Sequence, residues 1–159
     1  MSAFDPHITV ATVVLHEGRY LFVEESPHGT PVLNQPAGHL EGGESLADGA
    51  VREALEETGF RVRPTHLLGI YVWTSPANGA TYFRICFAGD LLEKVEGHEI
   101  DKDIDAVRWY SLEELRERQH QLRSPLVLRC VEDHAAGKRL PLDAIYDADD
   151  LARRAGHRA

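Results

Sequence analysis

The stretch "GHLEGGESLADGAVREALEETGF" (Gly38–Phe60) contains the most clearly delimited helix in the chain. Ser45 is a good N-cap residue, and Gly59 is suited to the left-handed conformation that ends many helices. Small and apolar residues recur between them at helical spacing: Ala47, Ala50, Val51, Ala54 and Leu55. The pattern predicts a helix over residues 45–58 with one buried face, which must pack against an apolar surface elsewhere in the fold.

The same helix carries Glu53, Glu56 and Glu57, whose side chains span an arc of roughly 100° at the helical spacing of about 100° per residue. Unneutralised like charges at this spacing cost roughly 0.2–0.5 kcal/mol per pair. The acidic face adjoins the buried face, so it lies at the rim of the fold, where clefts form. Three carboxylates there would suit Mg²⁺ or Mn²⁺. The alternative is an ordinary solvated face whose charges are partly neutralised by Arg52.

Length and composition indicate one globular domain over residues 1–159, with a core at about 5–140 and an uncertain tail from Lys138. The net charge of −9, from 17 basic and 26 acidic residues, disfavours non-specific nucleic-acid binding and favours small-molecule partners.

Cys86 and Cys130 lack metal-ligand spacing and are expected in the core as reduced thiols. No stretch has the pattern of a secretion signal or a membrane span, so we expect a cytoplasmic protein, and a monomer more than a dimer.

The N-terminal half reads mainly as sheet. His7–Leu15 and Arg19–Glu25 are β-branched and aromatic runs joined by a turn at Gly18. Residues 26–38 are rich in proline and glycine and read as a loop. Leu67–Ser75 and Ala80–Leu92 flank an Asn-Gly pair, which predicts a second hairpin.

The C-terminal part reads as a short strand at Ile104–Ser111 and then helices. The predicted helices cover Ser111–Arg118 and Ser124–Gly137, the second with an N-cap serine followed by proline. Strands that alternate irregularly with helices suggest a mixed sheet with helices packed on it.

The acidic helix and its flanks match the pattern G-x5-E-x7-R-E-U-x-E-E-x-G-U, where U is apolar, at every specified position. Those positions are Gly38, Glu44, Arg52, Glu53, Ala54, Glu56, Glu57, Gly59 and Phe60. The stretch therefore resembles the signature of the Nudix hydrolase family. The resemblance implies an α+β fold, an α/β/α sandwich with a mixed β-sheet between helices, and a Mg²⁺-dependent enzyme in which Mn²⁺ can replace Mg²⁺.

The resemblance also implies roles for individual residues. Glu53, Glu56 and Glu57 match the family's metal ligands, and Gly38 matches the glycine whose carbonyl often completes the metal shell. Arg52 matches the arginine that orients a catalytic glutamate, which makes Glu53 and Arg52 the expected catalytic pair. The family gives the position of Glu44 a mainly structural role.

Three further segments resemble the bacterial phosphatase NudJ subgroup of this family: "LNQPAGHLEGGE" (Leu33–Glu44), "DIDAVRW" (Asp103–Trp109) and "LRSPLV" (Leu122–Val127). This narrower resemblance implies release of orthophosphate from nucleoside tri- and diphosphates and from thiamine-pathway diphosphates such as hydroxymethylpyrimidine diphosphate and thiamine diphosphate. Alternatives are a pyrophosphohydrolase of another nucleoside diphosphate derivative and a non-catalytic Nudix-fold binding module. Complete retention of the glutamates favours catalysis.

Residues outside the signature offer further candidates. Glu99, Asp101 and Asp103 lie in a loop that could supply an additional base or metal ligand, although an exposed acidic loop is an equal alternative. Arg84 falls on the same side of its strand as Tyr82 and Cys86 and could bind a substrate phosphate, or it could be solvated.

Two weaker substrate-binding candidates are Gln35 and Trp73. The tryptophan ring could stack on a planar base, although an aromatic residue in a strand is more often part of a core. No pair of histidines has metal-ligand spacing.

Overall fold

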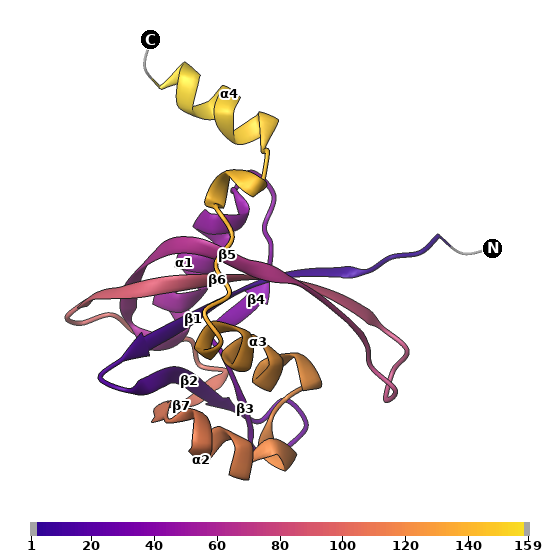
Figure 1. Cartoon of the computed structure of the whole chain (residues 1–159). Helices are drawn as coiled ribbons and strands as arrows, with labels where there is room; N and C mark the ends of the chain where they lie inside the picture. The colour runs from indigo at the N-terminus through magenta and orange to yellow at the C-terminus, as the bar shows by residue number, and fades with distance from the viewer. Residues whose placement is uncertain (1–2, 158–159) are drawn as a thin grey trace.

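The structure is a computed structural model that describes residues 3–157. Its strands are β1 (His7–His16), β2 (Arg19–Glu25), β3 (Val32–Asn34), β4 (Ala37–His39), β5 (Phe60–Thr74), β6 (Thr81–Lys94) and β7 (Ile104–Tyr110). Its helices are α1 (Leu46–Thr58), α2 (Leu112–Glu117), α3 (Pro125–Ala135) and α4 (Ala148–Gly156), with 3₁₀ turns η1 (Gln119–Gln121) and η2 (Leu142–Ala144). Figure 1 shows their arrangement along the chain.

The strands form a mixed sheet in the order β3-β2-β1-β6-β5, with β4 paired to β1 and β7 paired to β2. The pairing of β1 with β6 is parallel, and every other strand pairing described over residues 3–157 is antiparallel. The hairpin of β1 and β2 is confirmed. Its turn residues, Glu17 and Gly18, have φ values of 50° and 78°, and two successive positive φ values give a turn that suits the twist of paired strands.

Helices cover both faces of the sheet. Successive residues of a strand point to opposite faces, so Val10 and Ala11 of β1 mark the two sides. Val10 packs in a cluster with Ala50 of α1, whereas Ala11 packs in a cluster with Val127 of α3. The predicted α/β/α sandwich with a mixed sheet between helices is therefore confirmed, as Figure 1 illustrates.

The predicted helix ends are also confirmed. In α1, Ser45 Oγ accepts a hydrogen bond from the Asp48 N–H at 3.1 Å, and Gly59 adopts φ 76°. In α3, Ser124 is the N-cap and Pro125 is the first helical residue. Local side-chain chemistry is enough to fix these ends, which is why they can be read from the sequence.

Two predictions about the strands were wrong. Strand β5 begins at Phe60, directly after Gly59, and not at Leu67. Irregularities in its pairing with β6, one of them around Pro64, disturb the two-residue alternation that a strand prediction needs. The loop predicted over residues 26–38 contains the short strand β3 and the start of β4, which pair with β2 and β1 despite their unfavourable composition.

The tail after α3 is ordered into η2 and α4. Leu140 forms two backbone hydrogen bonds with Leu67, at 2.9 and 3.0 Å, which attach the tail to the outer edge of β5. Ile145 packs against the cluster beneath α1. Helix α4 follows at the C-terminal end, away from the sheet in Figure 1.

Cys86 and Cys130 are free and buried in the core between the sheet and α3, as predicted. Among residues 3–157, no helix is both long and apolar enough to span a membrane.

Candidate active site

Helix α1 presents its acidic face to β4 because the adjoining face is held in the core. Ala50 and Ala54 are fully buried against the sheet. The spacing of the helix then directs Glu53 and Glu57 toward Gly38 and Ala37 at the end of the sheet. The buried alanines thus set the position of the carboxylates.

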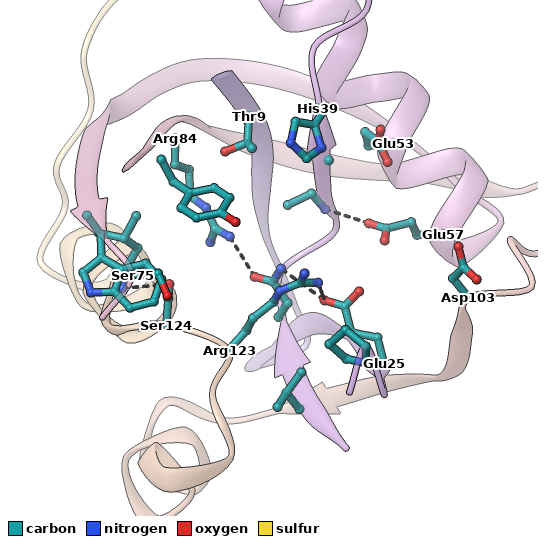
Figure 2. Close-up of a pocket in the computed structure, with 18 of the residues that line it drawn as sticks. Thr9, Glu25, His39, Glu53, Glu57, Ser75, Arg84, Asp103, Arg123 and Ser124 are labelled. Atoms are coloured by element: carbon teal, nitrogen blue, oxygen red, sulfur yellow. Dashed lines mark hydrogen bonds and ion pairs between the residues drawn. The ribbon is translucent and has the colours of Figure 1, made fainter. Parts of the chain in front are cut away.

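Glu57 is a buried carboxylate, with 6% of its surface exposed. Its Oε1 accepts a hydrogen bond from the Ala37 N–H at 2.7 Å (Figure 2). Burial raises the pKa of Glu57 to about 9; the Ala37 N–H opposes the shift, and the nearby Glu25, Glu53 and Asp101 carboxylates reinforce it. An ionised Glu57 therefore needs positive charge beside it, and a divalent cation would supply that charge.

Glu53 lies directly against the backbone of β4. A Cβ placed on Gly38 would collide with the Glu53 carboxylate, so only glycine leaves room for this approach. Burial is also the largest cause of the raised pKa of Glu53, although hydrogen bonding to Arg52 opposes the shift. A carboxylate with a raised pKa is a better proton acceptor than a solvated one.

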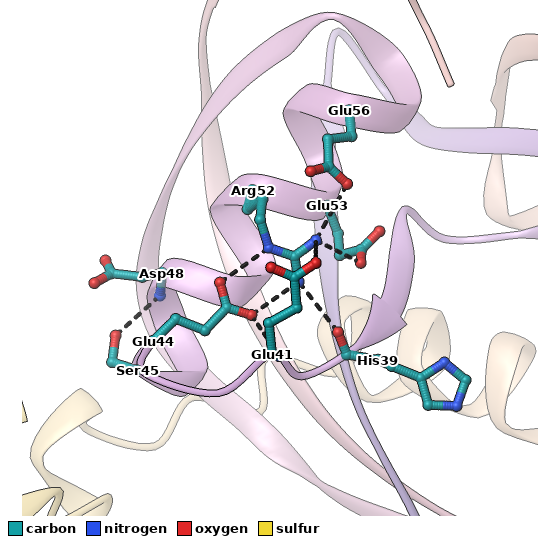
Figure 3. A network of polar contacts seen from close by, with 8 residues as sticks. All are labelled: His39, Glu41, Glu44, Ser45, Asp48, Arg52, Glu53 and Glu56. Atoms are coloured by element: carbon teal, nitrogen blue, oxygen red, sulfur yellow. Dashed lines mark hydrogen bonds and ion pairs between the residues drawn. The ribbon is translucent and has the colours of Figure 1, made fainter. Parts of the chain in front are cut away.

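Arg52 joins the acidic residues of this region into one network (Figure 3). Its guanidinium pairs with Glu44 at 2.8 Å, with Glu53 at 2.8 Å and with Glu56 at 3.1 Å. It also donates to the carbonyl oxygen of His39 at 3.1 Å. The contact with Glu53 is the one expected of an arginine that orients a catalytic glutamate, and the hydrogen bonds to Glu44 hold the pKa of that carboxyl below its ordinary value.

The four predicted metal ligands are not equivalent in the structure. Glu53, Glu57 and Gly38 line one cavity, whereas Glu56 is not among its lining residues and points to Arg52. Within residues 3–157, no three histidine, cysteine, aspartate or glutamate side chains converge closely enough to hold a metal ion. The donor set still fits a hard cation, because a buried carboxylate, a second carboxylate and a backbone glycine meet at one cavity wall.

The cavity has a volume of about 660 Å³ and lies between α1, the sheet and the start of α3 (Figure 2). Asp101 and Asp103 line it, but Glu99 is exposed and does not. The Asp101 N–H donates to the carbonyl oxygen of Glu56 at 2.8 Å, which ties this loop to the end of α1. Two of the three candidate loop acids therefore face the same space as Glu53.

Arg84 lines the opposite wall and is only 7% exposed, so the solvated alternative for it was wrong. It donates to Gln35 Oε1 at 2.5 Å and to Asn34 Oδ1 at 2.9 Å. Gln35 is completely buried, does not line the cavity, and donates to the carbonyl oxygen of Val127 at 2.6 Å. Gln35 is therefore placed to hold the side chain of Arg84, and it cannot contact a substrate in the cavity directly.

Trp73 lines the cavity and is half-buried, so it is not a core residue. It stacks on Tyr82 of the neighbouring strand, with ring centroids 6.2 Å apart, and Tyr82 stacks in turn on His7 at 4.8 Å. The three rings form a ladder across β5, β6 and β1 beside the cavity, which could accommodate a planar group.

A family model described as a NUDIX domain matches residues 5–130. The chain belongs to this family. The prediction of a Nudix hydrolase is confirmed, and the residues matched by the family model include all of the signature and both walls of the cavity described above.

Relatives of this Nudix hydrolase extend over nearly its full length. Proteins described as "Phosphatase NudJ" from Escherichia coli strain K12 and from Shigella flexneri are each 42% identical over 144 residues, which is 91% of this chain and 93% of each relative. The solved structure of a NUDIX hydrolase from Nitrosomonas europaea is 46% identical and has a TM-score of 0.88, with coverage of 91% of this chain and 99% of that one. A MutT NUDIX hydrolase from Burkholderia pseudomallei, 18% identical with a TM-score of 0.69, shares the fold.

Sequence reasoning missed several residues of the Nudix cavity, chiefly Glu25, Asn34 and Arg123. A signal for two of them was present, since they lie in two of the segments that resemble the NudJ subgroup. The structure joins those segments directly: the Arg123 N–H donates to the carbonyl oxygen of Leu33 at 2.9 Å. Glu25 had no such signal, because it reads only as the last residue of a strand.

Proposed function

We propose that this Nudix hydrolase uses Mg²⁺ to hydrolyse phosphoanhydride bonds in small diphosphate-containing molecules. The proposed substrates are nucleoside tri- and diphosphates and thiamine-pathway diphosphates, namely hydroxymethylpyrimidine diphosphate and thiamine diphosphate, with orthophosphate as the released product. The observation that carries the proposal is the charge arrangement of the cavity.

Charged side chains of both signs line the cavity. Glu53, Glu57 and Asp103 lie on one side, and Arg84 and Arg123 line the other, where Glu25 pairs with Arg123. A diphosphate group bound between them would have cationic side chains on one side and the carboxylates, with their metal, on the other. This arrangement suits a substrate that is itself strongly anionic at one end.

Each residue of the acidic wall has a proposed task. Glu53, oriented by Arg52, takes a proton from the attacking water, and Asp101 or Asp103 is the alternative base. Glu57 and Gly38 belong to the metal-binding set, and Glu56 joins them after exchanging its contact with Arg52. Bound Mg²⁺ supplies positive charge to the phosphoryl oxygens and lowers the pKa of coordinated water.

The opposite wall would hold the rest of the substrate. Arg84 contributes positive charge, and Gln35 keeps its guanidinium in place. Trp73 offers a face to a nucleobase or pyrimidine ring, which would allow the site to accept substrates that share only a planar ring and a diphosphate.

We propose attack at the terminal phosphorus, because relatives that match 91% of this chain are described as phosphatases. A substrate then needs only two phosphates.

The free, buried Cys86 and Cys130 are consistent with a reducing cytoplasm, where we place the activity. We propose a monomer, which light scattering coupled to size-exclusion chromatography would check.

The test is a panel of ATP, ADP, thiamine diphosphate and hydroxymethylpyrimidine diphosphate, assayed with Mg²⁺ for orthophosphate and for pyrophosphate. Reaction in ¹⁸O-labelled water identifies the attacked phosphorus. Label in orthophosphate supports the proposal. Labelled monophosphate together with unlabelled pyrophosphate from ATP would instead assign a pyrophosphohydrolase, and no turnover of any compound would remove the enzyme assignment for this substrate class.

A further inference from the structure

Arg123 lies just before α3 and lines the cavity across from the acidic wall (Figure 2). Its Nη1 contacts Glu25 Oε1 at 2.6 Å. The side chain of Arg123 is 46% exposed, whereas that of Glu25 is 12% exposed. Glu25 is therefore the buried partner of this ion pair, and Arg123 is the partner that is open to solvent.

The two arginines of the cavity differ in what their donors contact. Both terminal nitrogens of Arg84 donate hydrogen bonds to the buried side chains of Asn34 and Gln35. Arg123 makes its hydrogen bond through Nη1, and its Nε and Nη2 have no acceptor among residues 3–157. Because a guanidinium presents its donors as a planar fork, one edge of Arg123 can bind Glu25 while another meets a ligand.

The backbone and the carboxylate both fix the orientation of Arg123. Its N–H donates to the carbonyl oxygen of Leu33 at 2.9 Å, so the main chain is tied to β3. Glu25 pairs with Val32 in the sheet and also lies 3.4 Å from the side-chain nitrogen of Asn34. Because the main chain and the guanidinium of Arg123 are both held, the side chain loses little further conformational freedom when it binds an anion.

We infer that Arg123 is a substrate-binding residue that donates to a non-bridging phosphate oxygen, and that Glu25 is a positioning residue that holds its guanidinium toward the cavity. The inference rests on the proposed function. Among the positively charged side chains that line the cavity, Arg123 has the donors and the exposure that direct contact with a phosphate requires, whereas the terminal nitrogens of Arg84 already donate to Gln35 and Asn34.

A simpler role for Arg123 would be to neutralise Glu25, which also faces the cavity. The two roles predict different KM values for the double variant that lacks both charges. If Arg123 only neutralises Glu25, then Arg123→Ala should have no effect once Glu25 is replaced by glutamine. If Arg123 contacts phosphate, its removal should still weaken substrate binding in that background.

The experiment measures kcat and KM for ADP with Mg²⁺ in the wild type, Arg123→Ala, Arg123→Lys, Glu25→Gln and the Arg123→Ala/Glu25→Gln double variant. Loss of a charge-assisted hydrogen bond should raise KM roughly 10- to 100-fold in Arg123→Ala, with a smaller rise in Arg123→Lys. In the Glu25→Gln background, Arg123→Ala should still raise KM at least ~5-fold. Equal KM values for Glu25→Gln and the double variant would overturn the inference.

The control is Arg108→Ala, because Arg108 pairs with Glu24, the neighbour of Glu25, at 3.4 Å and is similarly exposed at 49%, but does not line the cavity. It should leave KM unchanged. Calorimetric binding of α,β-methylene-ADP with Mg²⁺ separates this inference from the proposed function. Weaker binding by Arg123→Ala supports a phosphate contact even without turnover, whereas equal binding, or no binding by the wild type, overturns it.

Discussion

Gly38 and Glu53 approach each other so closely that a side chain on the glycine would occupy the position of the glutamate carboxylate. The contact joins β4 to α1 at the point where the acidic wall of the cavity begins. The glycine of the Nudix signature therefore has a second structural role here, beyond the carbonyl ligand implied by the family resemblance, because its missing Cβ makes room for Glu53.

Gly38→Ala should lower kcat roughly 10- to 100-fold, because the added methyl group displaces the carboxylate of Glu53, the proposed catalytic base, by about an ångström. Gly42→Ala is the matched control: it lies in the same segment, and a Cβ there would meet nothing within 4 Å. Steady-state kinetics on both variants checks this, and equal kcat values would contradict the role assigned to the contact.

Glu57→Gln should lower kcat at least ~100-fold, because it removes the charge of a proposed metal ligand and keeps the shape of the side chain. We expect the same loss of kcat in Glu56→Gln. In EDTA, the Tm of Glu57→Gln should stay level or rise, because the raised pKa keeps the native carboxyl largely protonated at pH 7 and glutamine is also uncharged.

Calorimetric melting with and without Mg²⁺ provides the second readout for these variants. Mg²⁺ should raise the Tm of the wild type and raise that of Glu57→Gln by less, since a ligand that binds only the folded state stabilises it. Full activity in either glutamine variant would remove that residue from the metal-binding set.

Arg84→Ala should both raise KM and destabilise the fold. Its removal leaves buried acceptors on Gln35 and Asn34 without their donor, at a cost of at least ~2 kcal/mol in unfolding free energy. Arg63→Ala is the control, because Arg63 pairs with Asp90 at the surface and should cost less than about 0.5 kcal/mol. Urea unfolding of both variants measures the difference; equal stabilities would mean that the buried contacts of Arg84 contribute little.

His134 should make the fold sensitive to mild acid. Burial lowers its pKa from 6.5 to about 4, helped by the charge of Arg139. The unfolded chain takes up this proton near pH 6.5 and the folded chain only near pH 4, so stability falls as the pH drops through that window. The loss, discounted for partial exposure, is about 1–2 kcal/mol.

Replacement of His134 by glutamine should flatten the stability profile between pH 6.5 and pH 4. His120→Gln is the comparison, since His120 is exposed on turn η1, which precedes α3 in the chain. Urea unfolding at several pH values checks this, and a profile that keeps its slope in His134→Gln would assign the acid sensitivity to other groups.

Local chemistry allowed much of the framework to be predicted. Ser45 and Gly59 delimit α1 by their own hydrogen bonding and backbone preference, and the same holds for Ser124 and Pro125 at the start of α3. Strand β3 could not be predicted in this way, because its three residues are strand only by pairing with β2.

The sequence by itself determined the family, the helix that carries Glu53, Glu56 and Glu57, and the alternation that places Arg84 on the cavity side of its strand. These features depend on residues that are close in the chain. The tertiary structure alone decided that Glu57 is buried, that Glu56 turns to Arg52, and that Gln35 is buried behind Arg84. It also paired Glu25 with Arg123, 98 positions apart, because packing of α3 against the sheet brings together residues whose separation along the chain gives no local signal.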